Sequence, residues 1–124
     1  MKTVTIIARS LLGLISVVFG LNAFLHFIPM PPPQGLAGDF MKALFASHYF
    51  YVIALLQIAG GALLQVGRFV PLGLTLLGPV VVNILLFHIF LDPSGLPLAL
   101  VVSALSLFLL WAHRQAFAAL LKPL

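Results

Sequence analysis

The sequence predicts an all-α membrane protein: a four-transmembrane-helix bundle with a short interfacial helix in the first outer loop. Two observations predict this fold class. Charged residues make up only 6% of the 124 residues and hydrophobic residues 63%, whereas a soluble domain carries roughly 25% charged residues. The charges also leave uncharged stretches of 29, 25, 23 and 21 residues, and about 20 residues cross a bilayer as a helix. Residues 1–124 are therefore treated as a single transmembrane domain.

The composition also excludes several classes of function. Six Lys/Arg and two Asp/Glu cannot cover the surface of a soluble enzyme of this length. The basic residues are scattered and form no patch, so we expect no nucleic acid partner. The chain has no cysteine, which excludes disulfide, thiol-redox and thiolate-metal chemistry. The expected environment is the lipid bilayer.

The uncharged stretches place the four spans in order. They are predicted at about Thr5 to Ile28, Tyr49 to Val66, Phe69 to Leu91, and Leu96 to Phe117. A transmembrane β-strand would alternate polar and apolar residues, and the run 76–86 does not, so each span is a helix with its backbone hydrogen bonds satisfied internally. The first apolar stretch is long and lacks a small-x-small cleavage pattern, which favours a true span over a signal peptide.

The charges also predict the orientation. One side of the predicted bundle carries Lys2, Arg9, Arg68, Arg114 and Lys122, and the other carries Lys42 with both acids, Asp39 and Asp92. Cytoplasmic loops are enriched in Lys and Arg, so both termini are predicted to be cytoplasmic, and insertion in both orientations is disfavoured. We expect a multi-pass protein of the cell membrane, in a bacterium the inner membrane.

The connections between the spans differ in character. Gly67-Arg68 and 92–95 are predicted to be tight turns, because Gly, Pro, Asp and Ser favour turns. The first outer loop is longer and begins with a proline-rich extended segment at 29–33. From Leu36 to His48 apolar residues recur at helical spacing, which predicts a short helix lying in the outer interface.

Small residues indicate how the spans meet, since close helix contacts in lipid favour them. The first span carries a stripe of Gly13, Ser16, Gly20 and Ala23, the second Ala54, Gly60, Gly61 and Gly67, and the fourth Ala99, Ser103 and Ser106. Which stripe is internal is left open, so a homo-oligomer stays an alternative. Pro79 predicts a kink in the third span, because it cannot donate to the carbonyl of Thr75.

Polar residues are concentrated in the outer half of the spans. The candidate ligand-binding residues are Asn22, His26, Gln57, Asn83, His88 and Asp92. Intramembrane polar residues usually face a bundle interior or a cavity, so the prediction is a polar pocket open to the extracytoplasmic side. The Asp92 carboxylate, four residues after His88, is expected to orient the imidazole. The alternative is that these side chains only join helices or anchor helix ends, and His113 and Gln115 are expected at the solvated inner end.

Two segments resemble a known family. The segment from Arg9 through Gly13 and Gly20 to Asn22 is similar to the first helix of the DoxX-like family of small four-helix membrane proteins. The segment 57–68, with paired glycines and a final Gly-Arg, resembles that family's second helix. The resemblance implies association with membrane oxidoreductase complexes and thiosulfate-quinone electron transfer. Many members carry Glu where this chain has Gln57, and a neutral amide cannot carry a proton.

Three functions therefore compete. The first is a non-catalytic subunit or binding module, with no catalytic residue, that binds a small amphipathic ligand such as a quinone or scaffolds an oxidoreductase partner. The second is direct redox chemistry, with haem held by His26 and His88 or a metal held by these residues with His48 and Asp92. It is disfavoured because two histidines are weak evidence for haem and the spacing fits no compact metal motif. The third is a small transporter, although no carboxylate is predicted inside the membrane.

Overall fold

The computed structural model of the chain is helical, and its described residues, 2–29 and 32–123, contain no strand. The helices are α1 (Lys2–Leu25), α2 (Gly35–Ala46), α3 (Tyr49–Val66), α4 (Val70–Phe90), η1 (Pro93–Gly95), α5 (Leu96–Ala112), α6 (Arg114–Phe117) and η2 (Ala118–Leu121). Four segments are long and apolar enough to cross a membrane: α1, α3, α4, and η1 with α5. The all-α, four-span fold class is confirmed, and the chain is a multi-pass membrane protein.

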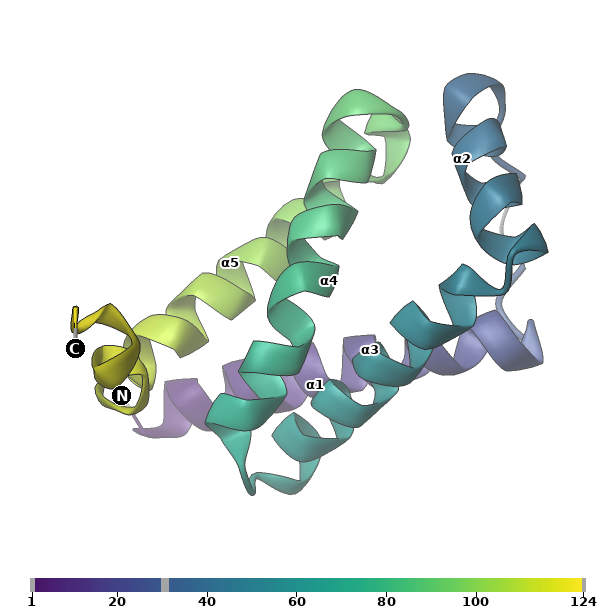
Figure 1. Cartoon of the computed structure of the whole chain (residues 1–124). Coiled ribbons are helices and arrows are strands. Elements are labelled where there is room, and N and C mark those ends of the chain that lie inside the picture. Colours follow the sequence, from purple (N-terminus) through teal and green to yellow (C-terminus); the bar gives the residue numbers. More distant parts are fainter. Residues whose placement is uncertain (1, 30–31, 124) are drawn as a thin grey trace.

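The four long helices form a ring in which each packs on the next along the chain and α5 returns to α1. Its core contains one fully buried leucine from each long helix, namely Leu12, Leu64, Leu77 and Leu109. Leu64 lies near the end of α3, just before the Gly67 turn. Leu109 lies near the end of α5, just before the C-terminal segment. The core is therefore concentrated at the end of the bundle that carries both termini, and toward the other end α4 and α5 diverge from α1 and α3 (Figure 1).

Glycines allow the backbones of neighbouring helices to approach closely. A Cβ on Gly61 would lie 2.8 Å from the Ser16 Cβ and 3.0 Å from the Gly13 carbonyl oxygen. On the adjacent side of α3, a Cβ on Gly60 would lie 3.0 Å from the Gly73 carbonyl oxygen of α4. The small-residue stripe of the first span is thus internal. Of the paired glycines of α3, Gly61 contacts α1 and Gly60 contacts α4.

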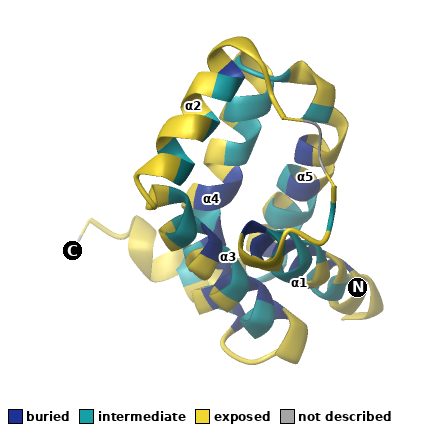
Figure 2. Ribbon diagram, turned by 90° about the vertical axis from the view of Figure 1, so that its right-hand side faces the viewer, coloured by how far each residue is buried: buried dark blue, intermediate teal, exposed yellow. Residues whose placement is uncertain are grey.

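The outer surface of the bundle is apolar. Large side chains on its long helices are well exposed, among them Ile7 at 60%, Leu55 at 58% and Leu107 at 67%, and exposed residues cover much of the ribbon in Figure 2. A contiguous apolar surface of this kind is rare on soluble monomers. It fits the hydrocarbon interior of a bilayer.

Several helix ends differ from the predicted bounds. The first helix ends at Leu25 rather than Ile28, because His26 has a left-handed backbone with φ 51°. The fourth span ends at Ala112, and His113 separates α5 from the short α6. The short helix of the first loop is confirmed as α2, and α4 continues through Pro79.

Candidate functional site

Two of the six predicted site residues act within the helix framework. The side chain of Asn22 closes the turn after α1: its Oδ1 accepts from the Ile28 backbone N–H at 2.7 Å, and its Nδ2 lies 3.5 Å from the Ile28 carbonyl oxygen. Gln57 joins two helices, since its Nε2 donates to the Ser16 carbonyl oxygen across the α1–α3 interface at 3.2 Å. Both amides already have backbone partners, which agrees with the helix-joining alternative for these positions.

His88 and Asp92 are close to one another, but the expected pairing of ring and carboxylate is wrong. Nδ1 of His88 lies 2.9 Å from the backbone carbonyl oxygen of Asp92. The carboxylate accepts instead from Ser94, at 2.6 Å from its hydroxyl and 3.3 Å from its N–H. The reason is local, because an Asp before a Pro-Ser-Gly turn caps the turn with its own side chain. A carbonyl can only accept, so Nδ1 of His88 carries the proton.

The His88 ring is held under the turn that follows it. A Cβ added at Gly95 would lie 2.6 Å from Nδ1 and 3.0 Å from Nε2. The Phe87 ring packs edge-on against the imidazole, with centroids 5.1 Å apart. The imidazole therefore stabilises the turn between α4 and η1.

The histidines are not gathered into one cluster. Among residues 2–29 and 32–123, no group of three or more His, Asp or Glu side chains is placed to hold a metal ion. His26 is exposed at the end of α1 and His48 stacks on Tyr51, with centroids 5.9 Å apart. The C-terminal ends of α1 and α4 lie on separate arms of the bundle (Figure 1), so the structure does not bring His26 and His88 together.

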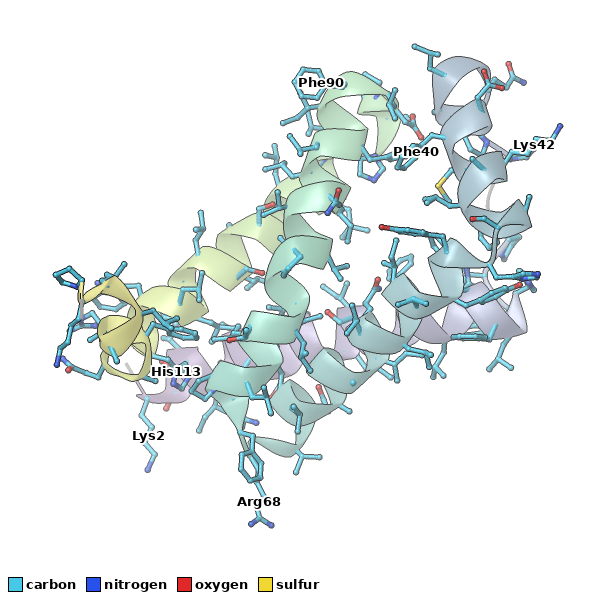
Figure 3. All side chains as sticks on the ribbon, viewed as in Figure 1. Lys2, Phe40, Lys42, Arg68, Phe90 and His113 are labelled. Atoms are coloured by element: carbon cyan, nitrogen blue, oxygen red, sulfur yellow. The ribbon has the colours of Figure 1, made fainter. Side chains whose placement is uncertain are left out.

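Asn83 is a predicted site residue that lines a cavity. A groove of about 300 Å³ lies against the C-terminal half of α4, and its lining residues are Phe40, Asn83, Leu86, Phe87, Phe90 and Leu91. Phe40 comes from α2, and its ring lies 5.7 Å from that of Phe87. In Figure 3 Phe40 extends from α2 toward α4, while Lys42 points to the opposite side of α2. We call this cavity the α2–α4 groove.

The amide of Asn83 has a defined orientation. Its Nδ2 donates to the Pro79 carbonyl oxygen at 2.7 Å, and because a carbonyl cannot donate, the amide cannot be flipped. One N–H of Nδ2 is left, and Oδ1 accepts no hydrogen bond from the described residues. In the groove this side chain offers one donor and one acceptor among aromatic and aliphatic neighbours.

Part of this groove was indicated by the sequence pattern. Phe87 lies four residues after Asn83 on the same face of α4, and Phe40 belongs to the apolar face of the predicted interfacial helix. Nothing in the local pattern showed that α2 folds back to place Phe40 against α4. Nε2 of His113 is buried without a hydrogen-bond partner in the described residues, although the residue is only half-buried and is followed by the exposed Arg114 and Gln115.

Comparisons with known proteins supply no further assignment. A scan of protein-family models and searches of curated proteins and solved structures found no match for this chain.

Proposed function

We propose that this chain is a non-catalytic membrane subunit or binding module that holds an amphipathic ligand of the quinone class in the α2–α4 groove. The observation that carries this proposal is Asn83, a single oriented amide in an aromatic groove of about 300 Å³. Ligand sites are typically apolar clefts of roughly 300–1,000 Å³ with a few placed polar groups.

The chemistry of the groove favours this ligand class. The remaining N–H of Asn83 is suited to donate to a quinone carbonyl, and Oδ1 to accept from a quinol hydroxyl. Phe40, Phe87 and Phe90 offer ring surfaces for a planar head group. Phe90 is 75% exposed, so an apolar tail bound beside it extends into lipid.

The resemblance to the DoxX-like family supports the redox context. In this proposal the chain presents the bound quinone to an oxidoreductase partner and performs no electron transfer itself. The mouth of the groove would face the extracytoplasmic half of the membrane, as the charge distribution predicts. Affinity purification in mild detergent tests the partner, because an oxidoreductase should co-purify with the chain. If the oxidoreductase does not co-purify with a groove variant, ligand binding and partner binding are connected.

The ligand is tested by titrating the nanodisc-reconstituted protein with decylubiquinone and its quinol. Asn83→Leu removes the hydrogen bonds at similar volume, and we expect affinity to fall roughly fivefold to tenfold, the effect of one hydrogen bond. Thr75→Val is the matched control, because Thr75 is exposed on the same face of α4 and donates to the Pro71 carbonyl oxygen at 2.8 Å outside the groove. Equal affinity for both variants and the parent protein would exclude the groove as the site.

A further inference from the structure

A second cavity lies at the end of the bundle that carries both termini. It has a volume of about 300 Å³ and is lined by Lys2, Thr5, Trp111, Ala112 and Arg114. These residues come from the first turns of α1, the last turn of α5 and the start of α6. We call it the terminal cavity.

The terminal cavity is strongly positive. Lys2 and Arg114 are cations, and no acidic side chain contributes to the lining. The two acids of the chain, Asp39 and Asp92, lie in α2 and just before η1. Asp92 and Arg114 are separated by the whole of α5, about 25 Å at 1.5 Å per residue, against a Debye length of about 8 Å. No carboxylate within the described ranges neutralises either cation.

The Arg114 guanidinium is held in place before any ligand binds. Its Nη1 donates to the Trp111 carbonyl oxygen at 2.9 Å, and its Cζ lies 4.6 Å from the centroid of the Trp111 ring. A guanidinium has five N–H donors, so this arrangement leaves most of them for another acceptor. A planar, pre-positioned guanidinium is suited to the oxygens of a phosphate group.

The surroundings indicate where that phosphate comes from. Arg114 lies two residues after the end of a membrane-spanning helix, at the level where Trp residues concentrate near lipid head groups. Leu107 and Leu110, which precede Trp111 by four residues and one residue, are 67% and 38% exposed. A lipid whose phosphate contacts Arg114 can therefore lay an acyl chain along this apolar face of α5.

We propose that the terminal cavity binds the phosphate-bearing head group of an anionic phospholipid. Arg114 contacts the phosphate, Lys2 adds a second positive charge at the rim, and Trp111 covers the glycerol region. In Figure 3 Lys2 extends away from the bundle on a long side chain, whose rotatable bonds allow the ammonium to approach the head group.

The single tryptophan of the chain provides the measurement, since Trp111 lines the cavity. The full chain is reconstituted in phosphatidylcholine vesicles that contain a minor fraction of brominated phosphatidylglycerol, and separately of brominated phosphatidylcholine. We expect stronger quenching of Trp111 fluorescence by the anionic lipid. Each basic residue near a membrane surface changes the local enrichment of anionic lipid roughly fivefold, so Lys2→Gln and Arg114→Gln should each lower the preference by about that factor.

Arg68→Gln is the control, because Arg68 is an exposed cation at the same end of the bundle that does not line the cavity. If it lowers the preference as much as Arg114→Gln, the lipid responds to general surface charge and the proposal is overturned. Equal quenching by the two brominated lipids overturns it as well. Inorganic phosphate added at constant ionic strength should leave the preference for the anionic lipid unchanged. If inorganic phosphate abolishes this preference, the cavity is a site for free phosphate. Because Arg114 also contacts the tryptophan, the Lys2→Gln variant separates loss of binding from altered fluorescence.

Discussion

The guanidinium of Arg9 in α1 donates a hydrogen bond from Nη1 to the carbonyl oxygen of Leu64, 2.6 Å away in the last turn of α3. The carbonyl groups at a helix C-terminus lack partners within the helix and attract cations. Gly67, with φ 82°, makes room for the contact, because a Cβ there would lie 3.0 Å from the Arg9 Cζ. One arginine of α1 thus caps a neighbouring helix.

We expect Arg9→Ala to lower the free energy of unfolding by about 1.5–3 kcal/mol, the range for hydrogen bonds to charged groups. Denaturation in mixed detergent micelles, followed by circular dichroism, measures this change. Arg68→Ala removes a cation of the same region without a hydrogen bond in the described residues, and its effect should stay within about 0.5 kcal/mol. Equal destabilisation by the two variants would contradict the capping role.

The α1–α3 contact gives a second prediction. Gly61→Ala introduces a Cβ 2.8 Å from the Ser16 Cβ, which forces the helices apart, and overpacking of this kind typically costs about 1–3 kcal/mol. Gly78→Ala is the matched control, since Gly78 lies inside α4 with no atom within 4 Å of an added Cβ. That variant should be neutral or more stable by up to about 1 kcal/mol. A Gly61→Ala protein as stable as the Gly78→Ala protein would refute the close contact.

The corner between α4 and η1 gives a third prediction. Gly95 has φ −94°, so alanine is compatible with its backbone, but the new Cβ would overlap the His88 ring. We expect Gly95→Ala to displace the imidazole and break its bond to the Asp92 carbonyl. Nitrogen NMR of the histidine rings would then show loss of the Nδ1–H tautomer. An unchanged His88 spectrum would mean that the turn does not hold the ring.

The attachment of α2 gives a fourth prediction. Ala37 is its one buried residue among those described, at 2% exposure, and its contact with α4 includes the ring of Phe40 on Phe87. Because few buried contacts imply easy local opening, hydrogen exchange should be faster in α2 than in α3. Phe40→Ala should accelerate it further.

Leu36 offers the control for this experiment. It lies one turn earlier in α2 and is 73% exposed, so Leu36→Ala should leave the exchange rates of α2 nearly unchanged. Slow exchange throughout α2 in the Phe40→Ala protein would show that the helix is held by other contacts.

The helices and their principal contact follow from local pattern. Long uncharged stretches determine the spans, and the spacing of Gly13, Ser16 and Gly20 indicated a face of α1 suited to close packing, which the structure places against α3. The spans and the small-residue face of α1 are predictable because helical periodicity relates sequence position directly to a helix face.

The hydrogen-bond partners of the polar side chains could not be predicted from the local sequence pattern. Asn22 and His26 were both expected in the polar pocket, but the helix ends at Leu25, and Asn22 bonds to the backbone beyond it. Similarly, the Asp92 carboxylate was expected to accept from the His88 ring, but it accepts from the nearby Ser94 hydroxyl. A short polar side chain bonds to whichever backbone or hydroxyl group is nearest, and spacing alone does not reveal that choice. The α2–α4 groove depends on where a loop helix returns, which is a tertiary property.

The divergence of the two helix pairs affects the membrane as well as the protein. The bundle is held together at the end near its termini, where Leu12 and Leu109 are fully buried, and is wider at the end that carries α2. A body of this shape occupies more area in one leaflet than in the other. Placed across a bilayer, such a body would displace unequal lipid areas from the two leaflets, and its insertion would create a difference in lateral packing between them.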